Sequence, residues 1–456
     1  MASHLSIKEI CIALNVQGHN TTDDTQITRI VTNSANATKG CLFFALAKNE
    51  AQNKLHAQEA LEKGAHVIAD TDVKGGIYVP SSPYALLSLA KYYKQTRLKN
   101  LIHTVAITGS NGKTTTKEIL TRLLRPSFKT HSTEGNQNNT LGVSYTILSA
   151  PLSTEVLVIE AGMNHSGELR LLSEAIAPSI CIITNVGTAH IGNLGSRKAI
   201  ADAKLEITEC LSPVGHTIIP YGESLLSSAK SPITVSLSEA NADVRLLIKA
   251  CACQKTTFDL CADGDEYTGL EASLTEEHQM KNLSLALAAS LLLQMDEKHL
   301  RAALLCLSED LQRHKFITLN SFTILDDSYN ASLESVASSL KILNSSKGVK
   351  SILLGDVKEL GEYDEQIHRK IGKIIAEFNP KNLYLIGVSV RYVMMEAIRC
   401  GFPSERICYN PDANNPQATA VHILNNHVRG ETILFKASRA MKLERVIDIL
   451  KSKEIR

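Results

Sequence analysis

The segment at 108–115, TGSNGKTT, is a glycine-rich turn that ends in a lysine and two threonines. Apolar residues at 103–107 predict a buried strand before it, and the spacing of apolar residues at 117–124 predicts a helix after it. A strand, a glycine turn and a helix together bind polyphosphates, because backbone N–H groups and the helix N-terminus point at the anion. The sequence therefore predicts a nucleotide phosphate site.

Individual residues of this turn have predicted roles. Lys113 brings charge to the β- and γ-phosphates, and the Thr114 hydroxyl supplies an oxygen for Mg²⁺. Ile107 stands where a full P-loop has its first glycine, so the loop is a variant. A turn that packs without a nucleotide is the alternative, but it gives no reason for Lys-Thr after the second glycine. The predicted nucleotide-binding residues are Gly109, Ser110, Asn111, Gly112, Lys113, Thr114 and Thr115.

Length and pattern predict an α/β protein of three domains. The chain has 456 residues, and a domain has roughly 150. Residues 1–80 have short apolar runs around one helical segment at 55–63, which predicts a small α/β domain. Residues 81–312 contain the phosphate loop and further buried strands, which predicts a central domain with a mainly parallel sheet. Residues 313–456 alternate between strand and helix, which is typical of a Rossmann-like, doubly wound domain.

Composition bears on partners and location. The 48 basic and 47 acidic residues balance, so nothing indicates a nucleic-acid partner. The N-terminus lacks the apolar region of a signal peptide, and the most apolar stretch, 283–293, is shorter than the ~20 residues of a membrane span. The ten scattered cysteines are typical of reduced thiols and not of a zinc site. We expect a cytoplasmic enzyme without membrane insertion; the oligomeric state is open, with a monomer favoured.

Polar residues follow several predicted strands, where open parallel sheets bind ligands. Glu160 follows four apolar residues and is placed beside the phosphate loop, where an acidic residue usually holds Mg²⁺. His190 lies past another strand end, and Lys204 lies in a predicted helix; alone, each fits a structural or solvated residue. The cluster at 326–330, DDSYN, combines two acids with an aromatic and an amide, which indicates ligand contact more than a turn.

Taken together, these segments resemble the Mur ligases of peptidoglycan synthesis. The motifs are in the family order and extend over nearly the whole chain. DDSYNA and GD-x-x-ELG resemble the members that add a dipeptide, and not those that add the first three amino acids. The matching segments are TGSNGKTTTK (108–117), GNQNNTLGVSYTIL (135–148), IEAGMNHSGEL (159–169), ITNVGTAHIGNLGS (183–196), IADAKLEI (200–207), HQMKN (278–282), DDSYNAS (326–332), GDVKELG (355–361) and KASRAMKLERV (436–446).

The resemblance implies an ATP-dependent amide ligase. Such enzymes phosphorylate the terminal carboxylate of UDP-N-acetylmuramoyl-tripeptide, and the amine of D-alanyl-D-alanine then attacks the acyl phosphate. The resemblance implies Mg²⁺ bound by Thr114, Glu160 and His190, and a carbamate on Lys204 that orients a second Mg²⁺. The catalytic residues would be Lys113, Glu160, His190 and Lys204.

Further binding residues follow from the same resemblance. His278 and Asn282 match the adenine side, while Arg313 and Asp327 match hinge-side residues that reach the nucleotide from the third domain. At 32–35 and 53–56 the chain departs from the usual Asp-Ser-Arg and Asp-Gly-His of the family, so details of the uridine contacts are open. The substrate-side matches are Ser34, Asn138, Asn139, Tyr329, Asn330, Lys436, Ser438 and Arg439.

Three alternatives stay open. A P-loop switch or motor is disfavoured by the incomplete glycine pattern and by the cluster at 326–332. A catalytically dead scaffold is disfavoured because all four predicted catalytic residues are present: Lys113, Glu160, His190 and Lys204. A folylpolyglutamate synthetase shares the nucleotide core, but DDSYNA points away from it. The sequence also leaves open whether the third residue of the tripeptide is diaminopimelate or lysine.

Overall fold

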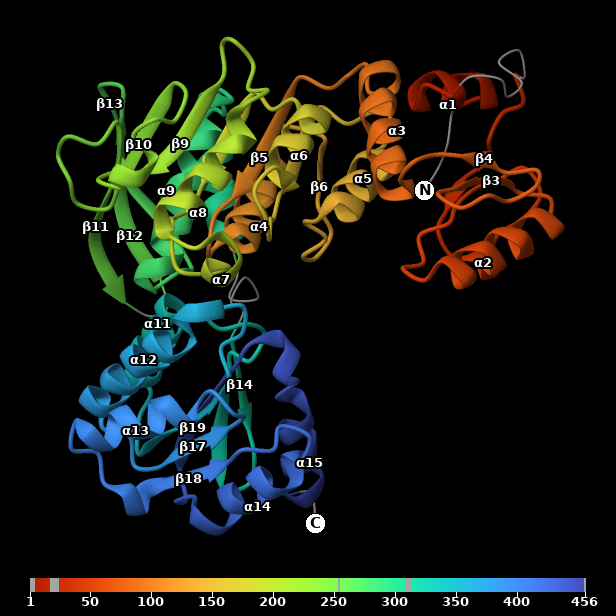
Figure 1. Ribbon diagram of the computed structural model, residues 1–456. Helices are drawn as coiled ribbons and strands as arrows, with labels where there is room; N and C mark the ends of the chain where they lie inside the picture. The colour runs from red at the N-terminus through yellow and green to blue at the C-terminus, as the bar shows by residue number, and fades with distance from the viewer. Residues whose placement is uncertain (1–4, 17–23, 253–254, 308–313, 455–456) are drawn as a thin grey trace.

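The computed structural model describes residues 5–16, 24–252, 255–307 and 314–454. It contains three separate sheets, of four, nine and six strands. Each sheet lies within one of the three predicted residue ranges, and we call the corresponding regions the N-terminal, central and C-terminal parts. Figure 1 shows the N-terminal part at one end of the central part and the C-terminal part below it. The domain boundaries themselves remain predictions.

The N-terminal part is a parallel sheet in the order β1-β2-β3-β4. Phe43 packs with Ala57 and Ala60 of α2 in one core of this part. Its chain neighbours Leu42 and Phe44 belong to a second core on the other face of the sheet. A single helical segment at 55–63 was predicted; the structure has a longer helix there and another near the N-terminus, whose capping box of Ser6 and Glu9 is a local signal that was missed. The elements are α1 (Ile7–Leu14), β1 (Ile30–Val31), η1 (Ser34–Asn36), β2 (Leu42–Phe44), α2 (Glu50–Glu62), β3 (His66–Ala69) and β4 (Ile77–Tyr78).

Helix α3 (Ser82–Arg97) joins the first two parts. It begins with a proline in its first turn, a position where the missing N–H costs no helical hydrogen bond. The Tyr93 hydroxyl donates to the Ala150 carbonyl of the central part at 3.1 Å. The N-terminal part is thus attached through a packed helix and not through a bare linker.

The central sheet has the order β13-β12-β11-β10-β9-β8-β5-β7-β6. Its strands from β6 to β11 pair in parallel, as predicted, and β11, β12 and β13 form an antiparallel extension that was not predicted. The elements are β5 (His103–Thr108), α4 (Lys113–Leu124), β6 (Thr130–Ser132), α5 (Thr140–Ser149), β7 (Val156–Glu160), α6 (Glu168–Ile176), β8 (Ile180–Ile183), α7 (Ile191–Leu194), α8 (Arg197–Leu205), η2 (Glu206–Thr208), β9 (His216–Pro220), η3 (Ser224–Leu226), β10 (Pro232–Ser236), β11 (Val244–Ala252), β12 (Lys255–Ala262), β13 (Asp265–Ala272), α9 (Glu277–Leu292) and α10 (Glu297–Leu305).

Strand β5 is buried on both faces, as expected of a central parallel strand. Val105 and Ile107 belong to the core that contains α4, α9 and α10, and Ala106 belongs to the core on the opposite face with α5 and α6. Ile107 pairs with Glu160, and Thr108 pairs with Ile183. The carboxyl ends of β5, β7 and β8 therefore lie together at one edge of the sheet.

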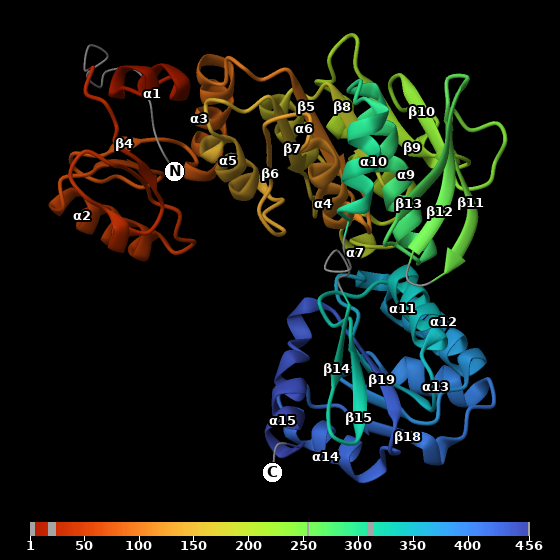
Figure 2. The same ribbon diagram turned by 180° about the vertical axis from the view of Figure 1, so that it is seen from behind.

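The C-terminal sheet has the order β14-β15-β19-β16-β17-β18, in which only the β14–β15 pair is antiparallel. Helices α11, α12 and α13 pack on one face, and α14 and α15 pack on the other (Figure 2), so the predicted doubly wound arrangement is confirmed. The elements are β14 (Lys315–Thr318), β15 (Phe322–Asp326), α11 (Leu333–Ser345), β16 (Lys350–Gly355), η5 (Gly361–Tyr363), α12 (Asp364–Phe378), β17 (Leu383–Ile386), α13 (Arg391–Arg399), η6 (Ser404–Arg406), β18 (Ile407–Asn410), α14 (Pro416–Asn426), β19 (Glu431–Lys436), η7 (Arg439–Met441) and α15 (Glu444–Glu454).

Across the described ranges, every helix is too short or too polar to cross a bilayer.

Candidate active site

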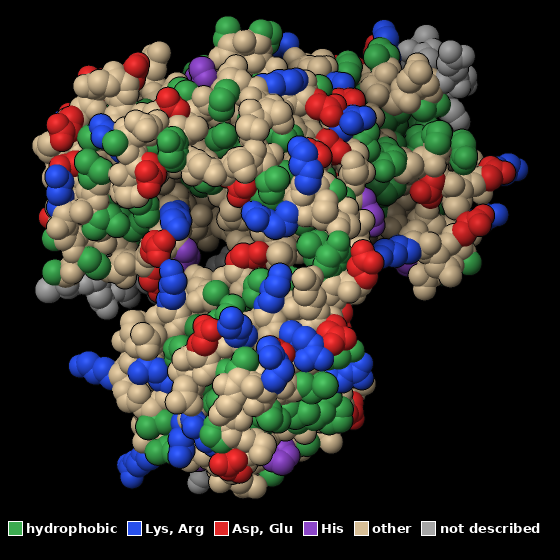
Figure 3. Space-filling model, turned by 60° about the vertical axis from the view of Figure 1, so that its left-hand side comes forward, with side chains coloured by type: hydrophobic (Ala, Val, Ile, Leu, Met, Phe, Trp, Pro, Cys, Tyr) green, Lys and Arg blue, Asp and Glu red, His purple; other side chains and the backbone are tan. Residues whose placement is uncertain are grey.

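A cavity of about 1020 Å³ lies between the central and C-terminal parts. Figure 3 shows the molecule hollowed where these two parts meet. The predicted site residues that line the cavity come from both parts. They are Gly109, Ser110, Asn111, Gly112, Lys113, Thr114, Thr115, Asn138, Asn139, Glu160, His190, Lys204, His278, Asn282, Asp327, Tyr329, Asn330 and Lys436.

Two glycines of the phosphate loop are required by space as well as by backbone conformation. Gly109 has φ 146°, and a Cβ there would lie 1.8 Å from Thr184 Oγ1. Gly112 has φ 83°, and a Cβ there would lie 2.5 Å from Asn282 Oδ1. Because both positive φ values favour glycine, the loop keeps its shape only with these residues.

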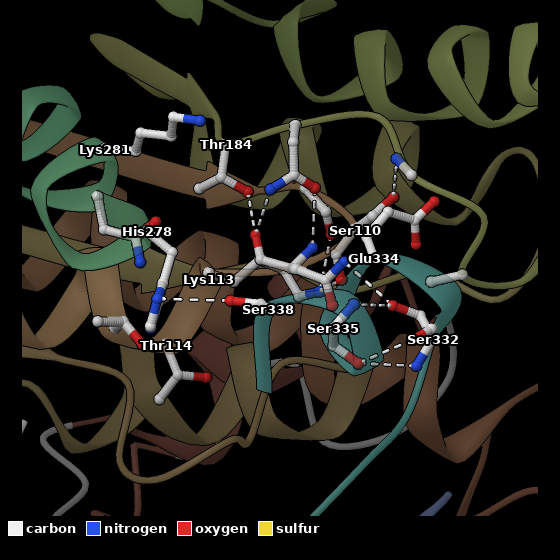
Figure 4. Close-up of a pocket in the computed structure, with 18 of the residues that line it drawn as sticks. Ser110, Lys113, Thr114, Thr184, His278, Lys281, Ser332, Glu334, Ser335 and Ser338 are labelled. Atoms are coloured by element: carbon white, nitrogen blue, oxygen red, sulfur yellow. Dashed lines mark hydrogen bonds between the residues drawn. The ribbon is translucent and has the colours of Figure 1, made fainter. Parts of the chain in front are cut away.

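The loop at 184–187 holds the phosphate loop in place. Asn111 donates its backbone N–H to Asn185 Oδ1 at 3.0 Å, and Thr184 Oγ1 donates to the Asn111 carbonyl at 2.5 Å. The N–H of Gly187 donates to Ser110 Oγ at 2.9 Å (Figure 4). These bonds from the loop after the neighbouring strand β8 hold the backbone of the phosphate loop in place.

Two lysines of α4 differ in their surroundings. Lys113 Nζ donates to the carbonyls of Gly109 and Ser110, at 2.7 and 3.3 Å. Its side chain therefore folds back onto the phosphate loop. Lys117 is fully buried and donates to the carbonyls of Thr133 and Gly135, both at 2.7 Å. Sequence reasoning missed Lys117. Its position one helical turn after Lys113 was the available signal, because that spacing places it on the same face of α4.

Glu160 and Thr114 present oxygens that fit a hard cation. Glu160 is 1% exposed; Asn138 Nδ2 donates to its Oε1 at 2.7 Å. Glu160 Oε2 and Thr114 Oγ1 are buried and have no hydrogen-bond partner in the described structure. Among the described residues no group of three His, Cys, Asp or Glu side chains forms a metal cage. The two unpartnered oxygens of Glu160 and Thr114 fit Mg²⁺, which usually takes one or two protein oxygens and completes its shell with waters and substrate phosphates.

Lys204 is buried in the wall of the same cavity. It is 1% exposed, which excludes the alternative of a solvated helix lysine. Burial, with the nearby positive charge of Lys113 as a second cause, holds the pKa of Lys204 well below its ordinary value. The side chain therefore favours the neutral amine, which is the form that reacts with CO₂.

The C-terminal part contributes an ion pair to the cavity. Lys436 Nζ lies 2.5 Å from Asp327 Oδ2, and Ser339 Oγ donates to the same oxygen at 2.5 Å. Asn330 and Tyr329 line the cavity from the loop after β15. The sequence cluster that ends β15 thus faces the phosphate loop across the cavity.

The side expected to hold the adenine carries a partly buried acid between two histidines. Glu276 Oε2 lies 3.2 Å from His278 Nε2, and Glu276 Oε1 lies 3.3 Å from His314 Nε2. Burial raises the pKa of Glu276 to about 7, and the charge of Asp327 adds to the shift. His278 Nδ1 also contacts Ser338 of α11 at 3.5 Å (Figure 4). Sequence reasoning did not find Glu276, because its role depends on packing against the C-terminal part.

Four predicted residues do not line this cavity or cannot be placed. Ser34 lies in the N-terminal part, where its hydroxyl donates to Glu59 Oε2 at 2.8 Å. Ser438 Oγ accepts the Lys358 N–H, and Arg439 forms an ion pair with Glu444 at 3.2 Å. Arg313 lies outside the described residues. Their predicted roles in binding remain predictions.

Comparison with known proteins agrees with this geometry. The Mur ligase middle domain family matches residues 107–290. UDP-N-acetylmuramoyl-tripeptide--D-alanyl-D-alanine ligase of Bacillus subtilis is 31% identical over 442 residues, which cover 94% of each chain. The ligase of the same name from Synechocystis sp. is 28% identical, and the alignment covers 94% of this chain and 93% of that protein. A crystal structure of MurF from Acinetobacter baumannii has a TM-score of 0.86 at 25% identity and covers 98% of each chain. This chain therefore belongs to the Mur ligase family.

Proposed function

We propose that this chain joins D-alanyl-D-alanine to the terminal carboxylate of UDP-N-acetylmuramoyl-tripeptide, with ATP cleaved to ADP and phosphate. The names of the relatives support this reaction. The observation that carries it is the convergence of the phosphate loop, Glu160, Lys204 and Lys436 on one cavity between two parts of the molecule. An ATPase that moved a partner would not need a second wall of ligand-binding side chains there.

The chemistry requires charge neutralisation more than a nucleophilic side chain. The carboxylate and the γ-phosphate are both anionic, so their approach is costly unless cations lie between them. Lys113 and the backbone N–H groups at the start of α4 supply positive charge at the phosphates. Bound at Glu160 and Thr114, Mg²⁺ would add Lewis-acid charge at the transferring phosphoryl group. Attack by the dipeptide amine on the acyl phosphate then forms the amide and releases phosphate.

We assign a carbamate to Lys204 as part of the same proposal. Its burial and depressed pKa support it, because CO₂ adds only to the neutral amine. The added group replaces a buried cation by an anionic oxygen donor, which hard cations prefer. Glu160 and His190 line the same cavity, and with them the carbamate would contribute to a second Mg²⁺ site.

The three parts have separate proposed tasks. We assign the UDP end of the first substrate to residues 1–80, ATP to 81–312 and the dipeptide to 313–456. The cavity between the central and C-terminal parts supports this division, because ATP and the dipeptide amine must meet at the same carboxylate.

Phosphate release by the purified protein tests the reaction. With ATP and Mg²⁺, release is expected only when UDP-N-acetylmuramoyl-tripeptide and D-alanyl-D-alanine are both present. A parallel series with lysine and diaminopimelate at the third position of the tripeptide determines which precursor is used. Phosphate release that is unchanged when either substrate is omitted would contradict the proposal.

A further inference from the structure

Residues 187–192 of the central part are contacted by the C-terminal part. Glu334, in the first turn of α11, accepts hydrogen bonds from the Thr188 N–H at 2.9 Å and from the Thr188 hydroxyl at 3.0 Å. Figure 4 shows Glu334 on the α11 side of the cavity, near Ser110. The same segment is tied to the phosphate loop through the Gly187 N–H and Ser110 Oγ. It therefore connects the phosphate loop to the C-terminal part.

A second contact brings two glycines together. The Gly192 N–H donates to the Glu359 carbonyl at 3.0 Å. A Cβ at Gly192 would lie 2.4 Å from the Gly361 backbone nitrogen, and one at Gly361 would lie 2.9 Å from the Gly192 Cα. No side chain fits at either position unless the two backbones separate. This close approach brings the turn that contains Glu359 against the end of the segment that contains His190.

The Glu359 side chain contacts the imidazole of His190. Glu359 Oε2 lies 2.6 Å from His190 Nδ1. His190 lines the cavity, whereas Glu359 is not among the described residues that line it, so the carboxylate contacts the ring from outside the cavity. A histidine that binds a metal through one ring nitrogen generally has a carboxylate or carbonyl at the other, which fixes the ring orientation and the tautomer.

We propose that Glu359 is a positioning residue for His190, so that docking of the C-terminal part completes the metal-binding side of the phosphate site. The inference rests on the proposed function, in which His190 faces Mg²⁺. Glu359 Oε2 lies against Nδ1 as a close charge contact, without the geometry of a hydrogen bond, so Nε2 is the ring nitrogen left for the cavity. Because Glu359 and His190 belong to different parts, the ring is held only while the two parts are docked. Glu359 of the GDVKELG segment thus acts by orienting His190, which requires no contact with substrate.

Calorimetric titration with ADP, in the presence and absence of Mg²⁺, tests this inference without either peptide substrate. Glu359→Ala should lower the Mg²⁺-dependent part of the ADP affinity about 10- to 100-fold, as is usual when a carboxylate behind a metal-binding histidine is removed. Its ADP affinity without Mg²⁺ should be unchanged. The Glu359 side chain is 54% exposed, so its removal should leave the fold intact. Glu362→Ala, an exposed carboxylate in the same turn, is the matched control.

Gly192→Ala tests the same inference by a different route. Alanine favours helix α7 more than glycine does, but its methyl group forces the turn at 359–361 away from His190. The variant should show the same loss of Mg²⁺ dependence as Glu359→Ala. Asn193→Ala, an exposed neighbour in α7, should bind ADP like the wild type in both buffers.

Retention of the wild-type Mg²⁺ dependence by both Glu359→Ala and Gly192→Ala would overturn the inference. An equal loss in Glu362→Ala would also overturn it, because the effect would then not be specific to the contact with His190. Failure of the wild-type protein to form the amide would instead contradict the proposed function. The two failures are distinguishable, because ADP titration does not depend on amide formation.

Discussion

Asn138 Nδ2 donates a hydrogen bond to Glu160 Oε1 at 2.7 Å, and the other oxygen of this carboxylate, Oε2, is buried without a hydrogen-bond partner in the described structure. Leaving a buried acceptor unsatisfied costs about 1–3 kcal/mol, and more for a charged group. The amide of Asn138 holds the carboxylate in one orientation. A cation bound at Oε2 would remove the free-energy cost of this unsatisfied acceptor. The folded protein is therefore expected to favour Mg²⁺ binding at this position.

Glu160→Gln should make the protein more stable in Mg²⁺-free buffer, by about 1 kcal/mol, because it removes a buried charge of which one oxygen has no hydrogen-bond partner. Mg²⁺ with ADP should raise the melting temperature of the wild type more than that of this variant. Urea unfolding and thermal melts measure the two effects, with the exposed Glu174→Gln as control. A variant that is less stable without Mg²⁺ and that keeps the full Mg²⁺ response would contradict the role given to Glu160.

Lys204→Ala should abolish amide formation, and acetate should restore part of it. The acetate carboxylate can occupy the place of the lost carbamate if that group is anionic, and a small amine cannot. Activity of the variant is measured against increasing acetate and, separately, methylamine. Rescue by methylamine and not by acetate would show that Lys204 acts as a cation, and the carbamate assignment would be wrong.

Substitutions in the Asp327–Lys436 ion pair should change stability and activity to different extents. Lys436 is 3% exposed, so Asp327→Ala removes the carboxylate that neutralises a buried ammonium and should cost about 3–5 kcal/mol of stability. It should also raise the KM for ATP and lower kcat, because Asp327 faces the nucleotide cavity.

A second substitution distinguishes the two effects. In Asp327→Ala with Lys436→Met the buried positive charge is removed together with its carboxylate, so most of the stability should return while activity stays low. Unfolding by urea and steady-state kinetics are compared across the wild type, the single variant and the double variant. Full activity in the double variant would refute the placement of this pair at the reacting groups.

The parts of the site that could be predicted are those whose residues are contiguous. The phosphate loop needs only the pattern at 108–115 and its flanking strand and helix. Glu160 was found because it directly follows an apolar strand. The burial of Lys204 could not be derived from its own helix, since it depends on how α8 packs against the central sheet; only the family resemblance pointed to it.

Contacts between distant segments were not accessible from the sequence. Glu334 and Glu359 act on residues of the central part, and a glutamate near the start of a helix or in a turn looks like an ordinary surface residue. The antiparallel strands β11 to β13 were missed for a similar reason. Most residues of β11 and β13 are exposed, so these strands lack the continuous apolar runs that revealed the parallel strands.

Stability should change with pH through Glu276. Its pKa is raised by burial from 4.5 to about 7, so the folded state binds more protons than the unfolded state between these values. The free energy of unfolding contributed by this group therefore falls as pH rises through that window. Glu276→Gln should gain stability over the wild type by roughly 2 kcal/mol between pH 5 and pH 8.

The measurement compares urea unfolding of the wild type and Glu276→Gln at both pH values. Burial lowers the pKa of His314, and this group is present in both proteins, so the comparison isolates the effect of replacing the Glu276 carboxyl. A difference in stability that is constant with pH, or that shrinks toward pH 8, would show that Glu276 is stabilised as a carboxylate by its histidine neighbours.

Isotope transfer from the tripeptide carboxylate tests the central claim most directly. UDP-N-acetylmuramoyl-tripeptide labelled with ¹⁸O in its terminal carboxylate is incubated with ATP, Mg²⁺, D-alanyl-D-alanine and the protein, and the products are analysed by mass spectrometry. Ligation through an acyl phosphate predicts one UDP-linked pentapeptide per ATP and one ¹⁸O atom in each released phosphate. Unlabelled phosphate, or ATP cleavage without pentapeptide, would contradict the account.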